Sequence, residues 1–422
     1  MKAYALMFCV TVALSYFYER ADRQQKNIYL RAVLAALILL IPSGMAGMRA
    51  LSVGTDLSRY VEPTYRYAVE STSYSGMVET IRGSYLGNLE PAYLLLIFLV
   101  SRLSADVHLF LFVISFIITL SIFLALRKMK DCCSLWIGEM VYMTLIYNES
   151  LNIMRQCIAL SLYLLAYACF VKREYIKTVL LVVLCYLFHR SSAIIVPIMV
   201  LWVLYSDWEG GRLAPKKEWV RPAMVGGIIL LFLIGLTIFQ PLCAWLWDRG
   251  LLPGKYYMFI KETPGGFLPP MVHVIYGWGY ICAFVAVRKI KNRDLFIVLA
   301  AADVIFYTLQ TRMPYLYRIA LYFLYFRVFL YSQLQAQLAG RLYREARSLS
   351  LGRVREFLRH PVTGLRVLYG NVCLTAVCSA DTDYVVDLCE IGIFASSLLF
   401  WLFFSVHWNN NETMPYMFMT RG

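Results

Sequence analysis

The sequence predicts an all-α integral membrane protein that is polytopic, meaning that it crosses the bilayer many times. Of its 422 residues, 60% are hydrophobic and only 16% are charged, and the mean hydropathy is +0.62. A soluble domain of this length carries far more charge and shows clearer amphipathic alternation. Apolar runs recur along the whole chain, so we expect a single transmembrane domain over residues 1–422. The first run has no small-residue cleavage site after it and is interpreted as a span, not a signal peptide.

The apolar runs divide into about 11–13 membrane helices, several of them short or re-entrant. In chain order the predicted spans are 3–18, 28–48, 89–103, 107–126, 133–150, 154–171, 175–188, 192–205, 222–246, 271–288, 294–311, 315–335 and 387–406. Several are shorter than the roughly twenty residues that a perpendicular helix needs. The pair 175–188 and 192–205 is the clearest case, because the polar sequence FHRSSA interrupts it.

Short basic loops orient these spans, because cytoplasmic loops carry an excess of lysine and arginine. The loops contain Arg20, Arg23 and Lys26; Arg127, Lys128 and Lys130; Lys172 and Arg173; Lys216 and Lys217; and the basic residues within 288–293 and 341–366. Alternation from the first loop places segment 49–88 outside. If 89–103 and 107–126 both crossed completely, Arg127 would also lie outside. Either segment 89–103 is re-entrant or partial, which we favour, or one loop breaks the rule. This distribution explains most of the net charge of +14 without nucleic acid.

Three connecting segments have a composition of their own. The long external loop 49–88 and the second external loop 247–270, which contains TPGGFLPP, have the length of functional lids over a membrane cavity. The segment 338–368 is basic and amphipathic, and is expected to lie on the anionic inner leaflet at the cytoplasmic side.

Metal and disulfide chemistry finds little support in the sequence. Most of the eleven cysteines lie inside apolar runs, and none forms a Cys-x-x-Cys pair, so they are expected to act as small buried hydrophobes. The Asp-x-Asp spacing in DTDY, residues 381–384, is typical of metal-dependent transferases, but no nucleotide-binding pattern surrounds it. We therefore expect no metal and no cofactor.

Charged and polar residues gather near the predicted external ends of the spans, where they are costly and need a reason. They are Arg49, Asp56, Arg59, Glu90, Asn152, Arg155, Gln156, His189, Arg312 and Arg318. Structural pairing explains any one of them, for instance Asp56 with an arginine or His189 with backbone carbonyls. Their convergence on one side is the informative observation, and it favours a shared site.

The chemistry of these residues suits a phosphorylated substrate. Arginine donates two parallel hydrogen bonds to phosphate and stays charged in a desolvated site, so arginines on separate helices can bind a diphosphate and stabilise it as a leaving group. Histidine as a residue type has an unperturbed pKa near neutrality, so His189 is a candidate base or hydrogen-bond donor. Asp56 and Glu90 are the carboxylate alternatives for activating a hydroxyl. The sequence does not choose among these three.

The order of the motifs resembles the EpsG family of Wzy-type exopolysaccharide polymerases. The motifs are MRALSVGTDLSRY (48–60), EPAYLLL (90–96), NIMRQCIA (152–159), FHRSSA (188–193), RIALYF (318–323) and PYMF (415–418). By this resemblance the Gly-Thr-Asp element falls on residues 54–56, the Glu-Pro element on Glu90, the Arg-Gln element on Arg155 and Gln156, and the His-x-Ser-Ala element on His189. The resemblance also implies a GT-C-like fold that works without a metal.

The resemblance implies a polymerase at the outer face of the bacterial cytoplasmic (inner) membrane. Its substrate would be an undecaprenyl-diphosphate-linked oligosaccharide, its surroundings membrane lipid, and its candidate protein partners a flippase and a chain-length regulator, with no nucleic acid. A transferase using a polyprenyl-phosphate sugar usually carries paired acids in the first external loop, where this chain has arginines. A flippase or exporter of lipid-linked oligosaccharide would favour pseudo-symmetric halves, which are not evident. The sugars, linkage and chain length stay open.

Overall fold

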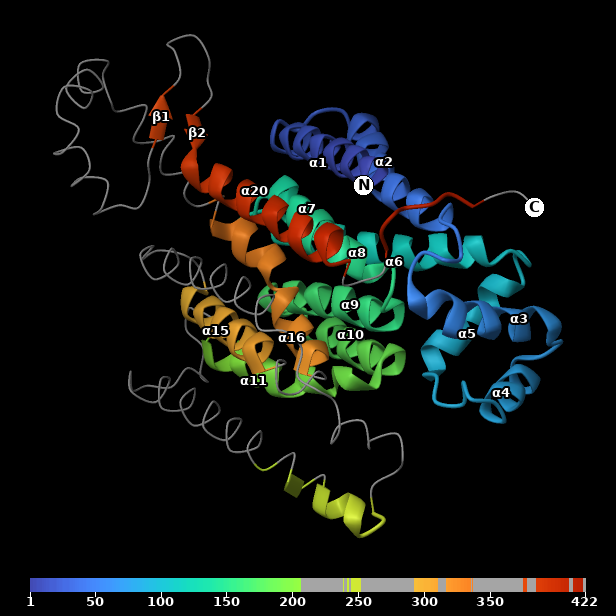
Figure 1. Ribbon diagram of the computed structural model, residues 1–422. Coiled ribbons are helices and arrows are strands. Elements are labelled where there is room, and N and C mark those ends of the chain that lie inside the picture. Colours follow the sequence, from blue (N-terminus) through green and yellow to red (C-terminus); the bar gives the residue numbers. More distant parts are fainter. Residues whose placement is uncertain are drawn as a thin grey trace. The chain divides into compact units, whose positions relative to one another are not determined.

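The computed structural model of the chain is almost entirely helical (Figure 1). It describes residues 1–205, 244–251, 292–309, 316–334, 385–409 and 413–419, with short pieces at 238, 241–242, 336 and 375–377. Among these residues the strands are β1 (Thr375–Val377) and β2 (Val385–Asp387), which pair antiparallel. The all-α prediction is confirmed for this part of the chain. Arg312, the basic segment 338–368, the span 271–288 and most of the segments 222–246 and 247–270 lie outside the described residues.

The described residues divide into two compact units. The first unit consists of Met1–Ala193 with Arg327–Gly422, and the second of Ile194–Phe326. In the second unit α15 (Arg293–Leu309) packs on α16 (Leu316–Leu324) and on α11 (Ile195–Tyr205). A stacked pair of rings, Phe306 and Phe323, joins α15 to α16 with centroids 4.9 Å apart.

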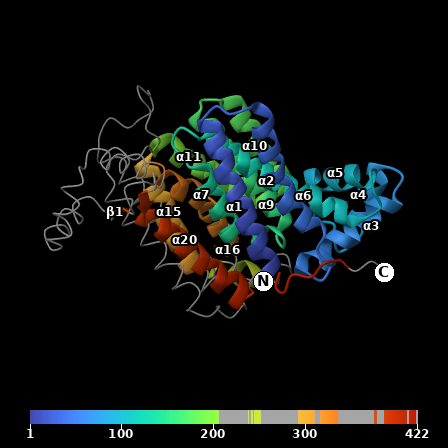
Figure 2. The same ribbon diagram turned by 90° about the horizontal axis from the view of Figure 1, so that it is seen from above.

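In the described part of the first unit, three helices are long and apolar enough to cross a membrane: α2 (Ile28–Gly47), α6 (Val107–Lys128) and α9 (Met154–Val171). α1 (Lys2–Arg23) packs on α2, α2 on α6, α6 on α9, and α9 on α10 (Tyr175–Phe188), as Figures 1 and 2 show. The bounds agree closely with the predicted spans. The chain is therefore a membrane protein, as the sequence predicts.

Two further segments of the first unit change helical type along their length. The predicted span 133–150 is α7 (Leu135–Val141), η2 (Tyr142–Ile146) and α8 (Tyr147–Ser150), and the predicted span 387–406 is α20 (Leu388–Phe400) and η5 (Trp401–His407). Both η2 and η5 are π-helical, a geometry that often marks functional sites. α20 packs against α7 and η2, and the Trp401 indole donates to Asn148 at 3.0 Å.

The long segment 49–88 is not simply a loop. It contains η1 (Leu57–Val61), α3 (Glu62–Glu70) and α4 (Tyr74–Arg82), which lie beside α5 (Pro91–Ser101) in both ribbon views (Figures 1 and 2). Arg102 donates to the carbonyls of Ala68 and Ser71, and so ties the end of α5 to the end of α3. These short helices carry too few apolar residues to be recognised as spans.

Ion pairs gather the basic loops at one end of the first unit. Asp22, near the end of α1, accepts hydrogen bonds from Arg31 at 2.7 Å and from Lys130 at 2.9 Å. Lys172 pairs with Asp131 at 2.5 Å. The turn after α1, the end of α6 and the turn after α9 therefore lie together. α5 spans 11 residues, which is about 16 Å of helix. The partial crossing of segment 89–103 stays a prediction.

Candidate functional site

Glu90 is the centre of a buried ion cluster formed from three of the sequence motifs. It lies at the N-cap of α5, where Pro91 begins the helix, and its side chain is only 5% exposed. Its Oε2 accepts from Nη1 of Arg155 at 2.5 Å, and its Oε1 lies 3.3 Å from Nδ1 of His189. The backbone N–H of Arg190 also donates to Oε1, at 3.4 Å. The cluster thus joins α5, the first turn of α9 and the end of α10.

The charges around Glu90 decide its protonation state. Burial raises the pKa of the Glu90 carboxyl, but the neighbouring His189 ring and Arg155 guanidinium outweigh burial and lower the pKa to about 2. Glu90 is therefore an anion at neutral pH. As a carboxylate, Glu90 has no proton to donate. It can instead hold an imidazole in one tautomer and stabilise that imidazole when it becomes protonated.

Arg155 is held between aromatic rings. Its guanidinium carbon lies 5.7 Å from the ring centroid of Tyr93 on α5 and 6.0 Å from that of Tyr60 on η1. Both distances are within the range of cation–π attraction. The side chain is 23% exposed. The pairing of Nη1 with Glu90 fixes the direction of the guanidinium.

The Gly-Thr-Asp turn packs directly on the start of the Arg155 helix. The Oδ1 atom of Asn152 accepts the backbone N–H of Asp56 at 3.0 Å and the hydroxyl of Thr55 at 3.4 Å. Gly54 adopts a φ of +94°, and a Cβ there would lie 3.2 Å from the carbonyl oxygen of Leu151. A glycine is therefore required for this close approach. The hydrogen bonds from Thr55 and Asp56 to Asn152 explain why polar residues occur in both motifs.

Arg49 is a second buried cation beside the same helix. It is 1% exposed, and its Nη2 lies 3.4 Å from the sulfur of Met154, the residue before Arg155. Among the described residues, its Nε and Nη1 have no hydrogen-bond partner. Burial lowers the pKa of Arg49, while Tyr4, Tyr147 and Tyr416 raise it. A guanidinium remains charged at neutral pH even so, so Arg49 keeps unused donors for an anion.

Residues 413–419, which we call the C-terminal strap, pack against the segment that carries Arg49. The N–H of Ala50 donates to Met417 at 2.8 Å, and the N–H of Met419 donates to Met48 at 2.9 Å, so that Arg49 pairs with Phe418. Further along the strap, the Tyr416 hydroxyl donates to the Met45 carbonyl at 2.7 Å.

Thr413 joins the strap to two helices of the first unit. Its carbonyl accepts from the Tyr4 hydroxyl at 3.1 Å, and its hydroxyl oxygen accepts from the Asn148 amide at 2.9 Å. Tyr4 lies on α1 and Asn148 on α8. The strap is therefore anchored by buried hydrogen bonds as well as by its pairing with the segment around Arg49.

The structure brings together part of the predicted site. Glu90, Arg155 and His189 are in direct contact, Asp56 is held beside them by Asn152, and Arg49 reaches Met154. Of the other predicted residues of the first unit, Gln156 is buried in α9, and Arg59 is exposed on η1, where its carbonyl accepts from Tyr85. Arg318 is exposed on α16 of the second unit, and Arg312 lies outside the described residues.

The tyrosines around the two arginines were not predicted from the sequence. Tyr60 and Tyr93 lie over Arg155, and Tyr4, Tyr147 and Tyr416 lie near Arg49. Three of the five, Tyr60, Tyr93 and Tyr416, fall inside the quoted motifs, and this was the available signal. An aromatic residue in so apolar a chain is otherwise indistinguishable from lipid-facing or interfacial material.

A sequence model of the EpsG family matches residues 32–345. The matched region contains all the predicted site residues, whereas the C-terminal strap lies beyond it. No curated protein and no solved structure matches the chain.

Proposed function

The chain belongs to the EpsG family, and we propose that it joins undecaprenyl-diphosphate-linked oligosaccharide repeat units into a surface polysaccharide. Family membership suggests a role like that of a polysaccharide polymerase, and the apolar helices indicate a membrane protein. In the proposed reaction, the growing chain on one lipid diphosphate is transferred to the non-reducing end of a new lipid-linked unit. The reaction takes place at the outer face of the bacterial cytoplasmic membrane, in which the chain is a multi-pass protein.

The observation that carries this proposal is the contact of Glu90 with both Arg155 and His189. Arg155 and His189 lie 65 and 99 positions after Glu90, the three residues lie on three elements, and each belongs to a different motif. Burying a carboxylate is costly unless it is paired and hydrogen-bonded. The basic loops lie at the other end of α10, which has 14 residues and is about 21 Å long. Under the positive-inside rule the cluster belongs to the outer side.

The geometry favours His189 as the base among the three candidates. Because Nδ1 lies 3.3 Å from a carboxylate oxygen of Glu90, we assign the proton transfer to the other ring nitrogen, Nε2. The acceptor hydroxyl oxygen attacks the anomeric carbon of the donor sugar while its proton passes to Nε2. The bond between that carbon and the diphosphate oxygen breaks, and the lipid diphosphate leaves with the electron pair. Glu90 acts as a positioning residue that stabilises the imidazolium.

Arg155 and Arg49 are the residues that we assign to the leaving diphosphate. Both are cations in a poorly solvated setting, and both have donors that the described partners do not use fully. Guanidinium groups placed where negative charge develops lower the barrier without reorganising. Asp56, held by Asn152, is the remaining carboxylate that can contact a sugar hydroxyl.

Deletion of the gene in the source bacterium tests this function directly. We expect single repeat units on the lipid carrier to accumulate at the outer face, with loss of long polymer. The wild-type gene and the control Arg190→Gln should restore polymer, because the Arg190 side chain is exposed and only its backbone contacts Glu90. His189→Gln should not restore it, although the protein is present at the normal level in the membrane.

Two other outcomes of the deletion would overturn the proposal. Complete repeat units trapped at the inner face would indicate a flippase. Repeat units that lack one sugar would indicate a transferase that uses a polyprenyl-phosphate sugar. Full activity of His189→Gln would refute its role as the base while leaving the polymerase function intact.

A further inference from the structure

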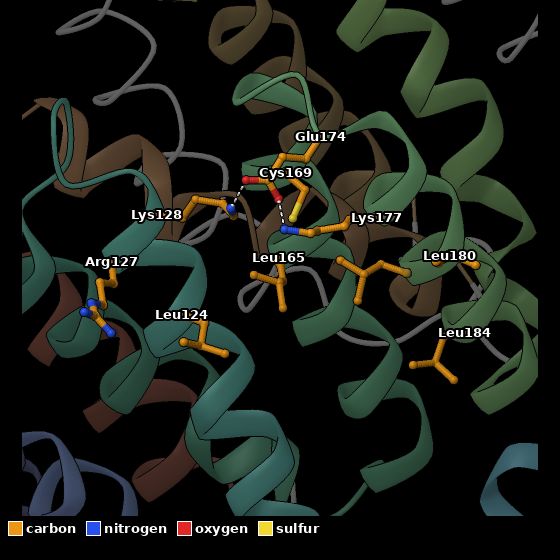
Figure 3. Close-up of a pocket in the computed structure, with 10 residues that line it drawn as sticks. Leu124, Arg127, Lys128, Leu165, Cys169, Glu174, Lys177, Leu180 and Leu184 are labelled. Atoms are coloured by element: carbon orange, nitrogen blue, oxygen red, sulfur yellow. Dashed lines mark hydrogen bonds and ion pairs between the residues drawn. The ribbon is translucent and has the colours of Figure 1, made fainter. Parts of the chain in front are cut away.

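A groove opens on the first unit at the end opposite the Glu90 cluster. It lies where α6, α9 and α10 pack together, and its volume is about 610 Å³ (Figure 3). α6 contributes its last turns, α9 its last turns and α10 its first turns. The groove therefore lies beside the loops that the positive-inside rule assigns to the cytoplasm.

The walls of the groove are apolar and open to the surroundings. They are lined by the leucines Leu124, Leu165, Leu180, Leu181 and Leu184. Leu180 is 63% exposed and Leu124 is 36% exposed. In Figure 3 the labelled leucines extend to one side of the polar residues. Leucines exposed along membrane helices offer a surface for an acyl chain, not for water.

The rim of the groove carries an excess of positive charge. Arg127, Lys128 and Lys177 line it together with one acid, Glu174. Glu174 pairs with Lys128 at 2.5 Å and with Lys177 at 2.9 Å, so it draws the two ammonium groups to the same place (Figure 3). One carboxylate cannot balance three cations. Among the described residues, Arg127 has no ion-pair partner at all.

We propose that this groove binds one anionic phospholipid of the inner leaflet, such as phosphatidylglycerol. The lipid phosphate lies at the rim between Arg127 and the two lysines, and an acyl chain lies along the leucines. The combination of a basic rim with an apolar wall matches both parts of such a lipid. Basic pockets between membrane helices on the cytoplasmic side are suited to anionic headgroups.

The same geometry argues against the groove as a second site for the polymerised substrate. The basic rim is far from the Glu90 cluster, because Lys177 lies twelve residues before His189, about 18 Å along α10, although the apolar wall extends to Leu184. Among the described residues that line the groove, no polar side chain beyond the rim could bind an oligosaccharide. Its occupant is therefore expected to be a lipid that stays in the inner leaflet.

Native mass spectrometry of the purified full-length protein tests the proposal. Detergent-solubilised protein is titrated separately with dioleoyl-phosphatidylglycerol, with zwitterionic dioleoyl-phosphatidylcholine and with undecaprenyl phosphate. We expect the wild type to bind phosphatidylglycerol at least tenfold more tightly. The double variant Arg127→Gln/Lys177→Gln should lose roughly 20-fold in affinity for phosphatidylglycerol, because each cation near a headgroup contributes a factor of about five.

The matched control is Lys26→Gln/Lys172→Gln, which removes the same charge from the same end of the unit but outside the groove. It should keep the preference for phosphatidylglycerol. Leu184→Trp, which keeps every charge and fills the groove, should weaken binding of the same lipid. Unchanged elution and thermal unfolding of each variant would show that its fold is retained.

Three results would overturn the proposal. They are equal binding of the two lipids, equal losses in the groove variant and the matched control, and binding of undecaprenyl phosphate in place of phosphatidylglycerol. None of these results depends on polymerase activity, so the lipid site and the proposed function can fail separately.

Discussion

The ion pair between Glu90 and Arg155 gives the sharpest prediction about the cluster. Glu90→Gln and Arg155→Gln each remove one charge and leave a side chain of similar size, and the double variant removes both. Each single change leaves a partner in a poorly solvated site without its counter-charge, and this is more costly than removing the whole pair. We therefore expect the double variant to be less destabilised than the sum of the two single variants.

The expected coupling is about 2 kcal/mol. Two charges about 4 Å apart interact by about 4 kcal/mol in the effective dielectric typical of protein sites. The side chain of Arg155 is 23% exposed, so solvent screening reduces this value by about half. The lowering of the Glu90 pKa from 4.5 to about 2 corresponds to roughly 3 kcal/mol, which Arg155 shares with His189.

The assay is a double-mutant cycle on the full-length protein in detergent micelles, with the free energy of unfolding measured for the wild type and the three variants. A matched cycle on Lys172 and Asp131 serves as control, because that pair is exposed and should show coupling below about 0.5 kcal/mol. If the Glu90–Arg155 cycle gives no more coupling than the control cycle, the two charges do not form the buried pair on which our reasoning depends.

Three further predictions concern protonation, the turn and the reaction. Because the pKa of Glu90 is lowered from 4.5 to about 2, its stabilising effect is present above pH 4.5 and is lost as the pH falls towards 2. The difference in unfolding free energy between wild type and Glu90→Gln should therefore shrink across that interval, and a constant difference would contradict it. Gly54→Ala should lower the free energy of unfolding by roughly 1–3 kcal/mol, because φ at this position is +94° and the new Cβ would meet the Leu151 carbonyl. Gly44→Ala is the control and should be tolerated, because no atom lies within 4 Å of a Cβ there. Polymerisation by purified protein should survive EDTA, because guanidinium groups can stabilise the leaving diphosphate; loss of activity restored only by magnesium or manganese would refute this.

The fold was predictable from the sequence wherever hydrophobicity alone determines where a helix begins and ends. The bounds of α2, α6, α9 and α10 follow the apolar runs to within two residues at either end. α3 and α4 were missed because they are short and amphipathic, with two or three buried residues each. Such helices form only when a neighbour such as α5 covers their apolar side, and sequence periodicity over nine residues is too weak to indicate that neighbour.

The site was predictable in composition but not in pairing. Sidedness, inferred from the basic loops, placed Glu90, Arg155 and His189 on the same face. Sidedness could not show that the Glu90 carboxylate contacts both Arg155 and His189, because those contacts depend on how α5, α9 and α10 pack. The proposal of His189 over Glu90 as the base rests on contacts that the sequence does not show, since they lower the pKa of Glu90 and place its carboxylate 3.3 Å from Nδ1 of the ring.

The C-terminal strap shows how a motif far from the others in sequence can belong to the same site. PYMF lies more than 300 residues after Arg49, yet its backbone pairs with residues 48–50 and Tyr416 acts on the Arg49 charge. We therefore expect truncation after Trp408 to lower polymer yield at least tenfold, by releasing Arg49 from its fixed position. Removal of only the last three residues, which lie beyond the strap, is the matched control and should have no effect. Normal polymer from the longer truncation would mean that the strap is a structural cover and that Arg49 does not depend on it.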